Sequence, residues 1–112
     1  MITIWHNPRC SKSRQTLTLV EEKGGVTVRR YLEDTPSLDE LASIKELLGV
    51  TTIEMMRPKE GLFKELGLSK SDDDAKLLAA MAAHPKLIER PIVIANGKAA
   101  FGRPPEAVLD IL

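Results

Sequence analysis

The sequence contains little cysteine, little histidine and no excess of charge of either sign, and each shortage excludes a class of protein. Cys10 is the only cysteine, so neither an intramolecular disulfide framework nor a cysteine-rich zinc site can form. A metal site built on the two histidines, His6 and His84, would depend heavily on carboxylates, and we expect no bound metal. The 16 basic and 16 acidic residues balance, which argues against a general nucleic-acid-binding protein.

Long apolar runs are also missing, since none approaches the ~20 residues that span a bilayer. The first ten residues lack both the basic segment and the sustained apolar segment of a signal peptide. We therefore expect a soluble cytoplasmic protein with no membrane partner, in a compartment that keeps Cys10 as a free thiol. The length of 112 residues and the hydrophobic content of 43% are typical of one globular domain, here residues 1–112.

Hydrophobic periodicity and turn residues predict the order of helices and strands. Strands are expected at residues 2–5, 26–32, 91–95 and 98–102, and helices at residues 11–23, 38–48, 52–56, 59–66, 71–83 and 104–112. Ser71 and Asp74 resemble an N-terminal capping arrangement for the fifth of these helices. Asn96-Gly97, between the last two strands, is the strongest short-range signal for a hairpin.

These elements fit one α/β architecture. The first strand–helix–strand unit is long enough for a right-handed crossover between parallel strands, whereas the hairpin requires an antiparallel pair. A mixed four-stranded sheet flanked by helices satisfies both requirements, and this is the thioredoxin-like arrangement. The helical segment at about residues 36–85 is then an insertion between the β-α-β and β-β-α halves.

Cys10 falls between the first strand and the first helix, where the exposed N–H groups and partial positive charge of a helix N-terminus favour a thiolate. We expect Cys10 to titrate below the value of about 8.5 for free cysteine. Ser13 lies over the same turn, so its hydroxyl is placed to donate a hydrogen bond to the sulfur. The alternative is a small buried hydrophobic residue, against which the polar and basic neighbours argue.

The same turn is suited to a tetrahedral oxyanion, because successive N–H groups that lead into a helix form a concave anion site. A nucleophile and an anion site at one turn indicate attack of the sulfur on the bound anion. A dithiol enzyme would need a second cysteine at the position of Ser13. Any redox cycle must therefore borrow its resolving thiol from another molecule, for which glutathione or glutaredoxin is expected.

Three arginines, Arg57, Arg90 and Arg103, each precede a proline. The planar fork of arginine matches the oxygens of a tetrahedral anion better than lysine does, so these three are candidates to surround it. The alternative is three solvated arginines among 16 basic residues. Pro91 opens a strand of the expected thioredoxin-like sheet, a position where proline is often cis and faces the nucleophile.

The sequence His-Asn-Pro-Arg-Cys-Ser-Lys-Ser-Arg at residues 6–14 looks like the active-site loop of the ArsC family, the glutaredoxin-coupled arsenate reductases. The resemblance continues in Met56-Arg57, in residues 89–93 and in residues 102–106, and it covers essentially the whole chain. Ser11 and Lys12 stand where well-studied members have a small Gly-Thr pair. The loop is thus closest to a subgroup of uncharacterised ArsC-like proteins.

The resemblance implies a thioredoxin-like fold with a helical insertion, and a nucleophilic Cys10. The family's oxyanion-binding arginines match Arg57, Arg90 and Arg103. The residues that support the thiolate and the anion loop match His6, Ser13 and Arg14. The implied chemistry is attack of Cys10 on arsenate, capture of the arseno-enzyme by glutathione, reduction to arsenite and regeneration by glutaredoxin, with no bound cofactor.

Two alternatives remain open. One is a non-catalytic interaction module like the Spx-type regulators, which share this fold and bind RNA polymerase. Those regulators usually carry a C-x-x-C switch, whereas this chain has Ser13 at the position of the second cysteine. The other is a monothiol redox enzyme that acts on another oxyanion or on a glutathionylated protein.

Overall fold

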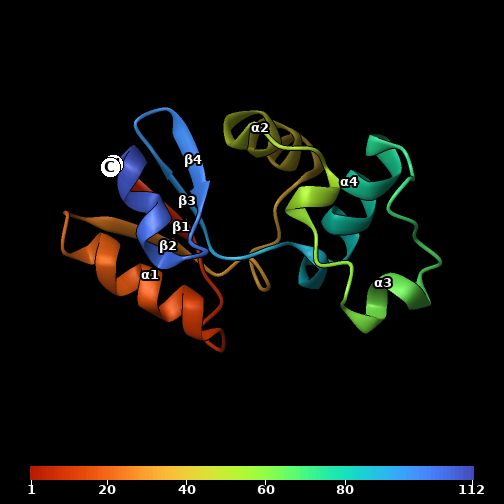
Figure 1. Cartoon of the computed structure of the whole chain (residues 1–112), viewed down its shortest axis with the longest axis horizontal. Helices are drawn as coiled ribbons and strands as arrows, with labels where there is room; N and C mark the ends of the chain where they lie inside the picture. The colour runs from red at the N-terminus through yellow and green to blue at the C-terminus, as the bar shows by residue number, and fades with distance from the viewer. The chain divides into compact units, whose positions relative to one another are not determined.

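The computed structural model describes all 112 residues, and the chain divides into two compact units (Figure 1). The first, the sheet unit, comprises Met1–Asp34 and Arg90–Leu112, and the second, the helical unit, comprises Thr35–Glu89. The helical unit has nearly the bounds expected for the insertion, residues 36–85. That the two units make a single domain stays a prediction.

The sheet unit contains four strands, β1 (Ile2–Trp5), β2 (Val26–Arg29), β3 (Ile92–Ala95) and β4 (Lys98–Phe101), in the spatial order β2-β1-β3-β4. β1 runs parallel to β2 and antiparallel to β3, and β3 and β4 form an antiparallel hairpin. The predicted mixed sheet is therefore confirmed.

The hairpin turn is formed by Asn96 and Gly97, which both have positive φ, 55° and 72°. These angles are those that a two-residue turn with the right-handed twist of the strands requires, and Asn-Gly adopts them at low cost. The side-chain amide of Asn96 also donates to the carbonyl of Ile111 at 2.9 Å, which ties the turn to the end of the chain.

Two helical segments, α1 (Ser11–Glu21) and η3 (Pro105–Ile111), lie side by side against the sheet (Figure 1). Val20 of α1 and Val108 of η3 pack with Ile4 and Val93 of the sheet, and all four side chains are fully buried. The helix expected at residues 104–112 is present as a 3₁₀-helix. The amino end of α1, which holds the candidate nucleophile, is thus anchored to the sheet by the apolar carboxyl half of the same helix.

The helical unit contains α2 (Leu38–Leu48), η1 (Ile53–Met55), α3 (Gly61–Glu65), α4 (Asp74–Ala83) and η2 (Pro85–Leu87). α2 has the bounds predicted from sequence, because a capping box of Ser37 and Glu40 starts it and Gly49, in the left-handed conformation, ends it. No helix of either unit combines the length and apolar character that crossing a membrane requires.

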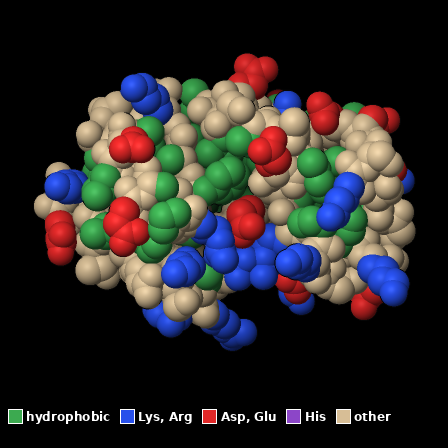
Figure 2. All heavy atoms as spheres, in the orientation of Figure 1, with side chains coloured by type: hydrophobic (Ala, Val, Ile, Leu, Met, Phe, Trp, Pro, Cys, Tyr) green, Lys and Arg blue, Asp and Glu red, His purple; other side chains and the backbone are tan.

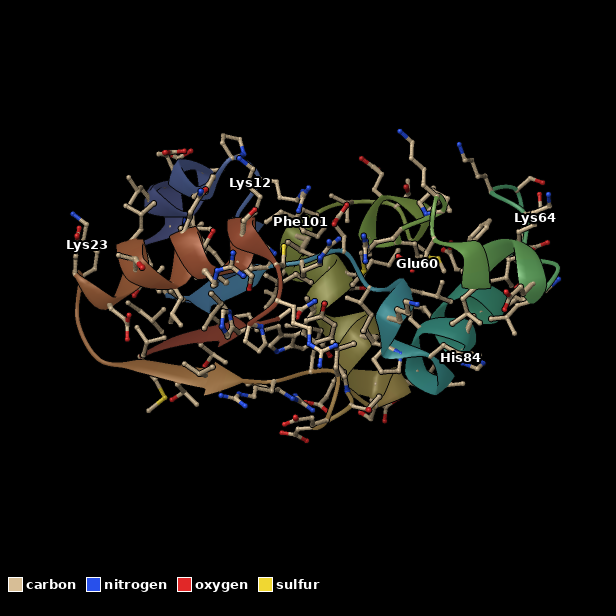
Figure 3. The ribbon with its side chains drawn as sticks, turned by 90° about the horizontal axis from the view of Figure 1, so that it is seen from below. Lys12, Lys23, Glu60, Lys64, His84 and Phe101 are labelled. Carbon is tan, nitrogen blue, oxygen red and sulfur yellow. The ribbon has the colours of Figure 1, made fainter.

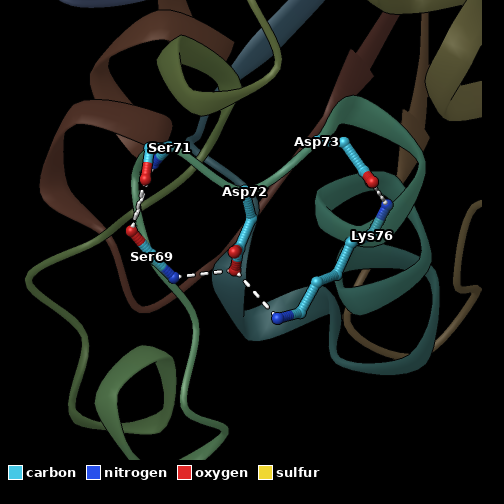
Figure 4. A network of polar contacts seen from close by, with 5 residues as sticks. All are labelled: Ser69, Ser71, Asp72, Asp73 and Lys76. Carbon is cyan, nitrogen blue, oxygen red and sulfur yellow. Dashed lines mark hydrogen bonds and ion pairs between the residues drawn. The ribbon is translucent and has the colours of Figure 1, made fainter.

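The start of α4 differs from the expectation. Asp73, not Ser71, is the N-cap, and its carboxylate accepts the N–H of Lys76 at 2.8 Å (Figure 4). Asp72 accepts the N–H of Ser69 at 2.8 Å and lies 3.2 Å from the Lys76 ammonium, while the hydroxyls of Ser69 and Ser71 contact each other at 2.9 Å. The expected cap was wrong because these local bonds of Ser69 and Asp72 fold residues 69–72 into a turn before the helix begins.

Candidate active site

Cys10 is the N-cap residue of α1, with extended backbone (φ −96°, ψ 123°), and its side chain is nearly buried at 9% exposure. Its N–H donates to the carbonyl of Asn7 at 3.0 Å, so residues 7–10 form a turn that leads into the helix. The thiol therefore lies at the amino end of α1, where the free N–H groups of the first helical turn are found.

Burial alone would raise the pKa of the Cys10 thiol, because it disfavours the charged form. The backbone N–H groups of Ser13 and Lys12 act in the opposite direction, because their positive ends favour the charged form of the sulfur. The positive charges of Arg90 and Arg103 add to their effect, and together they hold the pKa of Cys10 below its ordinary value. The arrangement therefore favours a thiolate, the nucleophilic form of cysteine.

The hydroxyl of Ser13 has a different role from the one expected. It lies 2.6 Å from Nδ1 of His6 and accepts the N–H of Asn7 at 3.0 Å, whereas the backbone N–H of Ser13 is the group that lowers the pKa of the thiol. Burial, followed by the charges of Arg30 and Arg14, lowers the pKa of His6. A neutral imidazole and a fully buried hydroxyl thus connect the end of β1 to the first turn of α1.

Arg14 supports the loop from its outer side. Its guanidinium donates to the carbonyl of Pro8 at 2.9 Å, across the turn that precedes Cys10. Figure 2 shows Lys and Arg side chains at the lower edge of the sheet unit, where the start of α1 lies in Figure 1. The loop is therefore held by backbone and side-chain bonds in a basic part of the surface.

Arg90 and Arg103 are brought to Cys10 from two other loops of the sheet unit. Arg90 comes just before β3 and Arg103 just after β4, and the peptide bonds to Pro91 and Pro104 are both cis. Nη1 of Arg103 donates to the carbonyl of Arg90 at 3.2 Å, which joins the two loops. Two of the three arginines expected at the site are thus close enough to lower the pKa of the thiol.

Arg57 belongs to the helical unit, where it lies between η1 and α3. Its N–H donates to the carbonyl of Leu87 at 2.8 Å, and its guanidinium lies 3.0 Å from the Glu60 carboxylate. Glu60 also lies 3.2 Å from the ammonium of Lys86 (Figure 3 labels Glu60). A part in anion binding stays a prediction for Arg57.

Sequence reasoning missed a contact between Thr16 and Gly102 that positions the arginine loops. Thr16 is fully buried, and its hydroxyl proton is shared between the carbonyl of Lys12, at 2.7 Å, and, more weakly, that of Gly102, at 3.4 Å. The N–H of Gly102 donates to the carbonyl of Pro91 at 3.0 Å. Gly102 is therefore bonded to α1 on one side and to the Arg90-Pro91 segment on the other, immediately before Arg103.

Only glycine fits at this position. A Cβ on Gly102 would overlap Oγ1 of Thr16 and would lie 2.7 Å from Cγ of Pro91. We expect Gly102→Ala to destabilise the protein by about 1–3 kcal/mol, the usual cost of overpacking, and to displace Arg103 from the sulfur. Denaturant unfolding measures the first effect, and the pH dependence of Cys10 alkylation measures the second as a raised pKa.

Gly25→Ala is the matched control, because a Cβ there meets nothing within 4 Å. Thr16→Ala combined with Gly102→Ala removes part of the overlap, so the double variant should recover part of the loss. Equal stability and equal Cys10 pKa in the Gly102 and Gly25 variants would show that the contact positions nothing.

No group of three or more His, Cys, Asp or Glu side chains is arranged to hold a metal ion. What the sheet unit offers is a thiol of lowered pKa beside backbone N–H groups and two guanidinium groups. This set of groups is suited to nucleophilic attack by sulfur on a bound tetrahedral oxyanion.

Comparison with known proteins relates the whole chain to one family. The sequence model of the ArsC family matches residues 5–111. An arsenate reductase of Neisseria meningitidis serogroup B is 53% identical over 99% of this chain and 97% of its own length, and the uncharacterised protein YfgD of Escherichia coli is 50% identical over 99% and 96%. The solved structure of an arsenate reductase from Vibrio cholerae is 54% identical, with a TM-score of 0.95 over 99% of this chain and 97% of that one. The chain belongs to the ArsC family.

Proposed function

We propose that this protein is an arsenate reductase in which Cys10 is the nucleophile. The observation that carries the proposal is the thiol whose pKa is lowered at the amino end of α1, between backbone N–H donors and the guanidinium groups of Arg90 and Arg103. The relatives named arsenate reductase, at about half identity over nearly the whole chain, support arsenate as the anion.

The first chemical step uses the thiolate directly. Cys10 sulfur attacks the arsenic of bound arsenate, a sulfur–arsenic bond forms, and one arsenate oxygen takes up protons and leaves as water. Arg90 and Arg103 hold the remaining oxygens and offset their negative charge. Ser11 and Lys12 are compatible with this step, since their side chains are exposed and the backbone N–H of Lys12 helps to lower the pKa of the thiol.

The supporting residues keep the loop in position. His6 and the Ser13 hydroxyl fix the first turn of α1, so the N–H of Ser13 faces the sulfur, while Arg14 holds the preceding turn. Because His6 is neutral, it does not attract the anion away from Arg90 and Arg103. These residues act through the backbone of the loop rather than on the arsenic.

The electrons for reduction come from outside the chain, because arsenate to arsenite takes two electrons and Cys10 has no partner cysteine. Glutathione attacks the arsenic on Cys10, and a second water leaves. A glutaredoxin thiolate then attacks the glutathione sulfur, which forms a mixed disulfide and leaves arsenic(III) on Cys10. Hydrolysis releases arsenite and the free thiol. The reaction needs no bound cofactor and fits the reducing cytoplasm.

A coupled assay tests the proposal. Purified protein, arsenate, glutathione, glutaredoxin, glutathione reductase and NADPH should give NADPH oxidation that stops when arsenate, glutathione or glutaredoxin is omitted. Oxidation that needs another oxyanion or a glutathionylated protein instead of arsenate would favour the monothiol alternative. If the protein turns over neither arsenate, nor another oxyanion, nor a glutathionylated protein, but binds RNA polymerase, an Spx-like module would be favoured.

A further inference from the structure

A small pocket lies beside the loop that carries Cys10. Its volume is about 160 Å³, and it is lined by two segments of the sheet unit, residues 6–9 and the stretch after β2 that includes Arg30, Leu32 and Glu33. Sites for drug-sized ligands usually exceed about 300 Å³, so this pocket has room for one end of a short peptide.

The charges around this pocket are distinct from those around the sulfur. Arg90 and Arg103 lower the pKa of Cys10, whereas Arg9 and Arg30 line the pocket. The side chains of Arg9, Arg30 and Glu33 form no ion pair or hydrogen bond within the chain. The pocket therefore presents two guanidinium groups and one carboxylate whose charges a ligand can complement.

The wall of the pocket is the turn that ends at Cys10. Asn7, Pro8 and Arg9 line it, and the N–H of Cys10 is bonded to the carbonyl of Asn7 at 3.0 Å. Arg9 directly precedes Cys10, and consecutive Cα atoms are about 3.8 Å apart, so a tripeptide held at Arg9 is longer than the separation of these two residues along the backbone.

We propose that this pocket binds a carboxylate-bearing end of the peptide thiol that reduces the arseno-enzyme. Arg9 and Arg30 hold the carboxylate, and Glu33 faces the ammonium group of the same molecule. Glutathione, with two carboxylates, one ammonium group and one thiol, has this chemistry. The proposal rests on the proposed function, because it is the co-reductant of that reaction that occupies the pocket.

Steady-state kinetics of the double variant Arg9→Ala/Arg30→Ala test the assignment. We expect the KM for glutathione to rise about tenfold, the effect of losing two exposed ion pairs, with the KM for arsenate and the pKa of Cys10 unchanged. The matched control is Lys23→Ala. It removes a cation that lies just beyond the carboxyl end of α1, whereas Lys12 lies at the amino end of that helix (Figure 3). A KM for glutathione equal to that of the control, or a rise in the KM for glutaredoxin instead, would overturn the assignment.

Binding of S-methylglutathione, which cannot react, separates this proposal from the proposed function. NMR titration of the wild type should shift the amide signals of Leu32 and Glu33, and the double variant should weaken that binding by a similar factor. A wild-type protein that binds S-methylglutathione there but makes no arsenite would leave the pocket assigned and refute the reductase. A protein that makes arsenite but shows no such shifts would refute the pocket assignment and leave the reductase standing.

Discussion

Replacing Cys10 with serine is expected to lower arsenate-dependent NADPH oxidation by at least about a thousandfold, to the background of the coupled assay. The N–H donors and guanidinium groups around the side chain would remain, so the variant should still bind the anion. A serine hydroxyl is not ionised near neutral pH, and no other thiol exists in the chain to replace Cys10. The loss should therefore fall on kcat rather than on anion binding.

Folding of the serine variant is checked by far-UV circular dichroism and by denaturant unfolding, both of which should match the wild type. Ser11→Ala is the matched control, because Ser11 is the exposed neighbour of Cys10 in the same helical turn. That control should keep near wild-type activity. A Cys10→Ser protein that folds and still reduces arsenate would exclude the sulfur nucleophile.

Replacing Arg103 with alanine is expected to cause the second large loss of activity. A hydrogen bond to a charged group contributes about 1.5–3 kcal/mol, so kcat/KM for arsenate should fall by roughly ten- to a hundredfold. The pKa of Cys10 should rise at the same time, because the positive charge of Arg103 helps to lower it. Initial rates and the pH dependence of alkylation measure the two effects.

Arg103→Lys distinguishes charge from geometry in the same experiment. Lysine retains the positive charge but not the planar fork, so the pKa of Cys10 should stay close to that of the wild type while kcat/KM for arsenate remains lowered. Lys98→Ala, which removes an exposed cation at the hairpin end of β4, should change neither quantity. If the alanine variant at Arg103 behaves like that control, Arg103 is a solvated surface residue.

The parts of the fold that were predictable are those with a local cause. The bounds of α2 follow from a capping box and a left-handed glycine, and the hairpin follows from Asn96-Gly97, all within a few residues of the feature they determine. The position of Cys10 before a helix is equally local. The lowered pKa was therefore predictable from chain position, and the structure adds the contribution of Arg90 and Arg103.

The parts that were not predictable depend on residues far apart in the sequence. Thr16 and Gly102 are 86 positions apart, and nothing near either one indicates that they touch. The buried face of α1 also begins with polar residues, Ser13 and Thr16, which apolar periodicity does not indicate as buried. Both side chains are satisfied by hydrogen bonds to other parts of the site, which is how a buried polar face is stabilised.

The most direct test of the central claim is the rate of Cys10 alkylation by iodoacetamide as a function of pH, with and without arsenate. Only the thiolate reacts, so a lowered pKa moves the midpoint of the rate profile to a pH below that of free cysteine, about 8.5. Arsenate should slow the reaction by occupying the site at the sulfur. A midpoint at or above 8.5, with no protection by arsenate, would contradict a thiolate held in an oxyanion site.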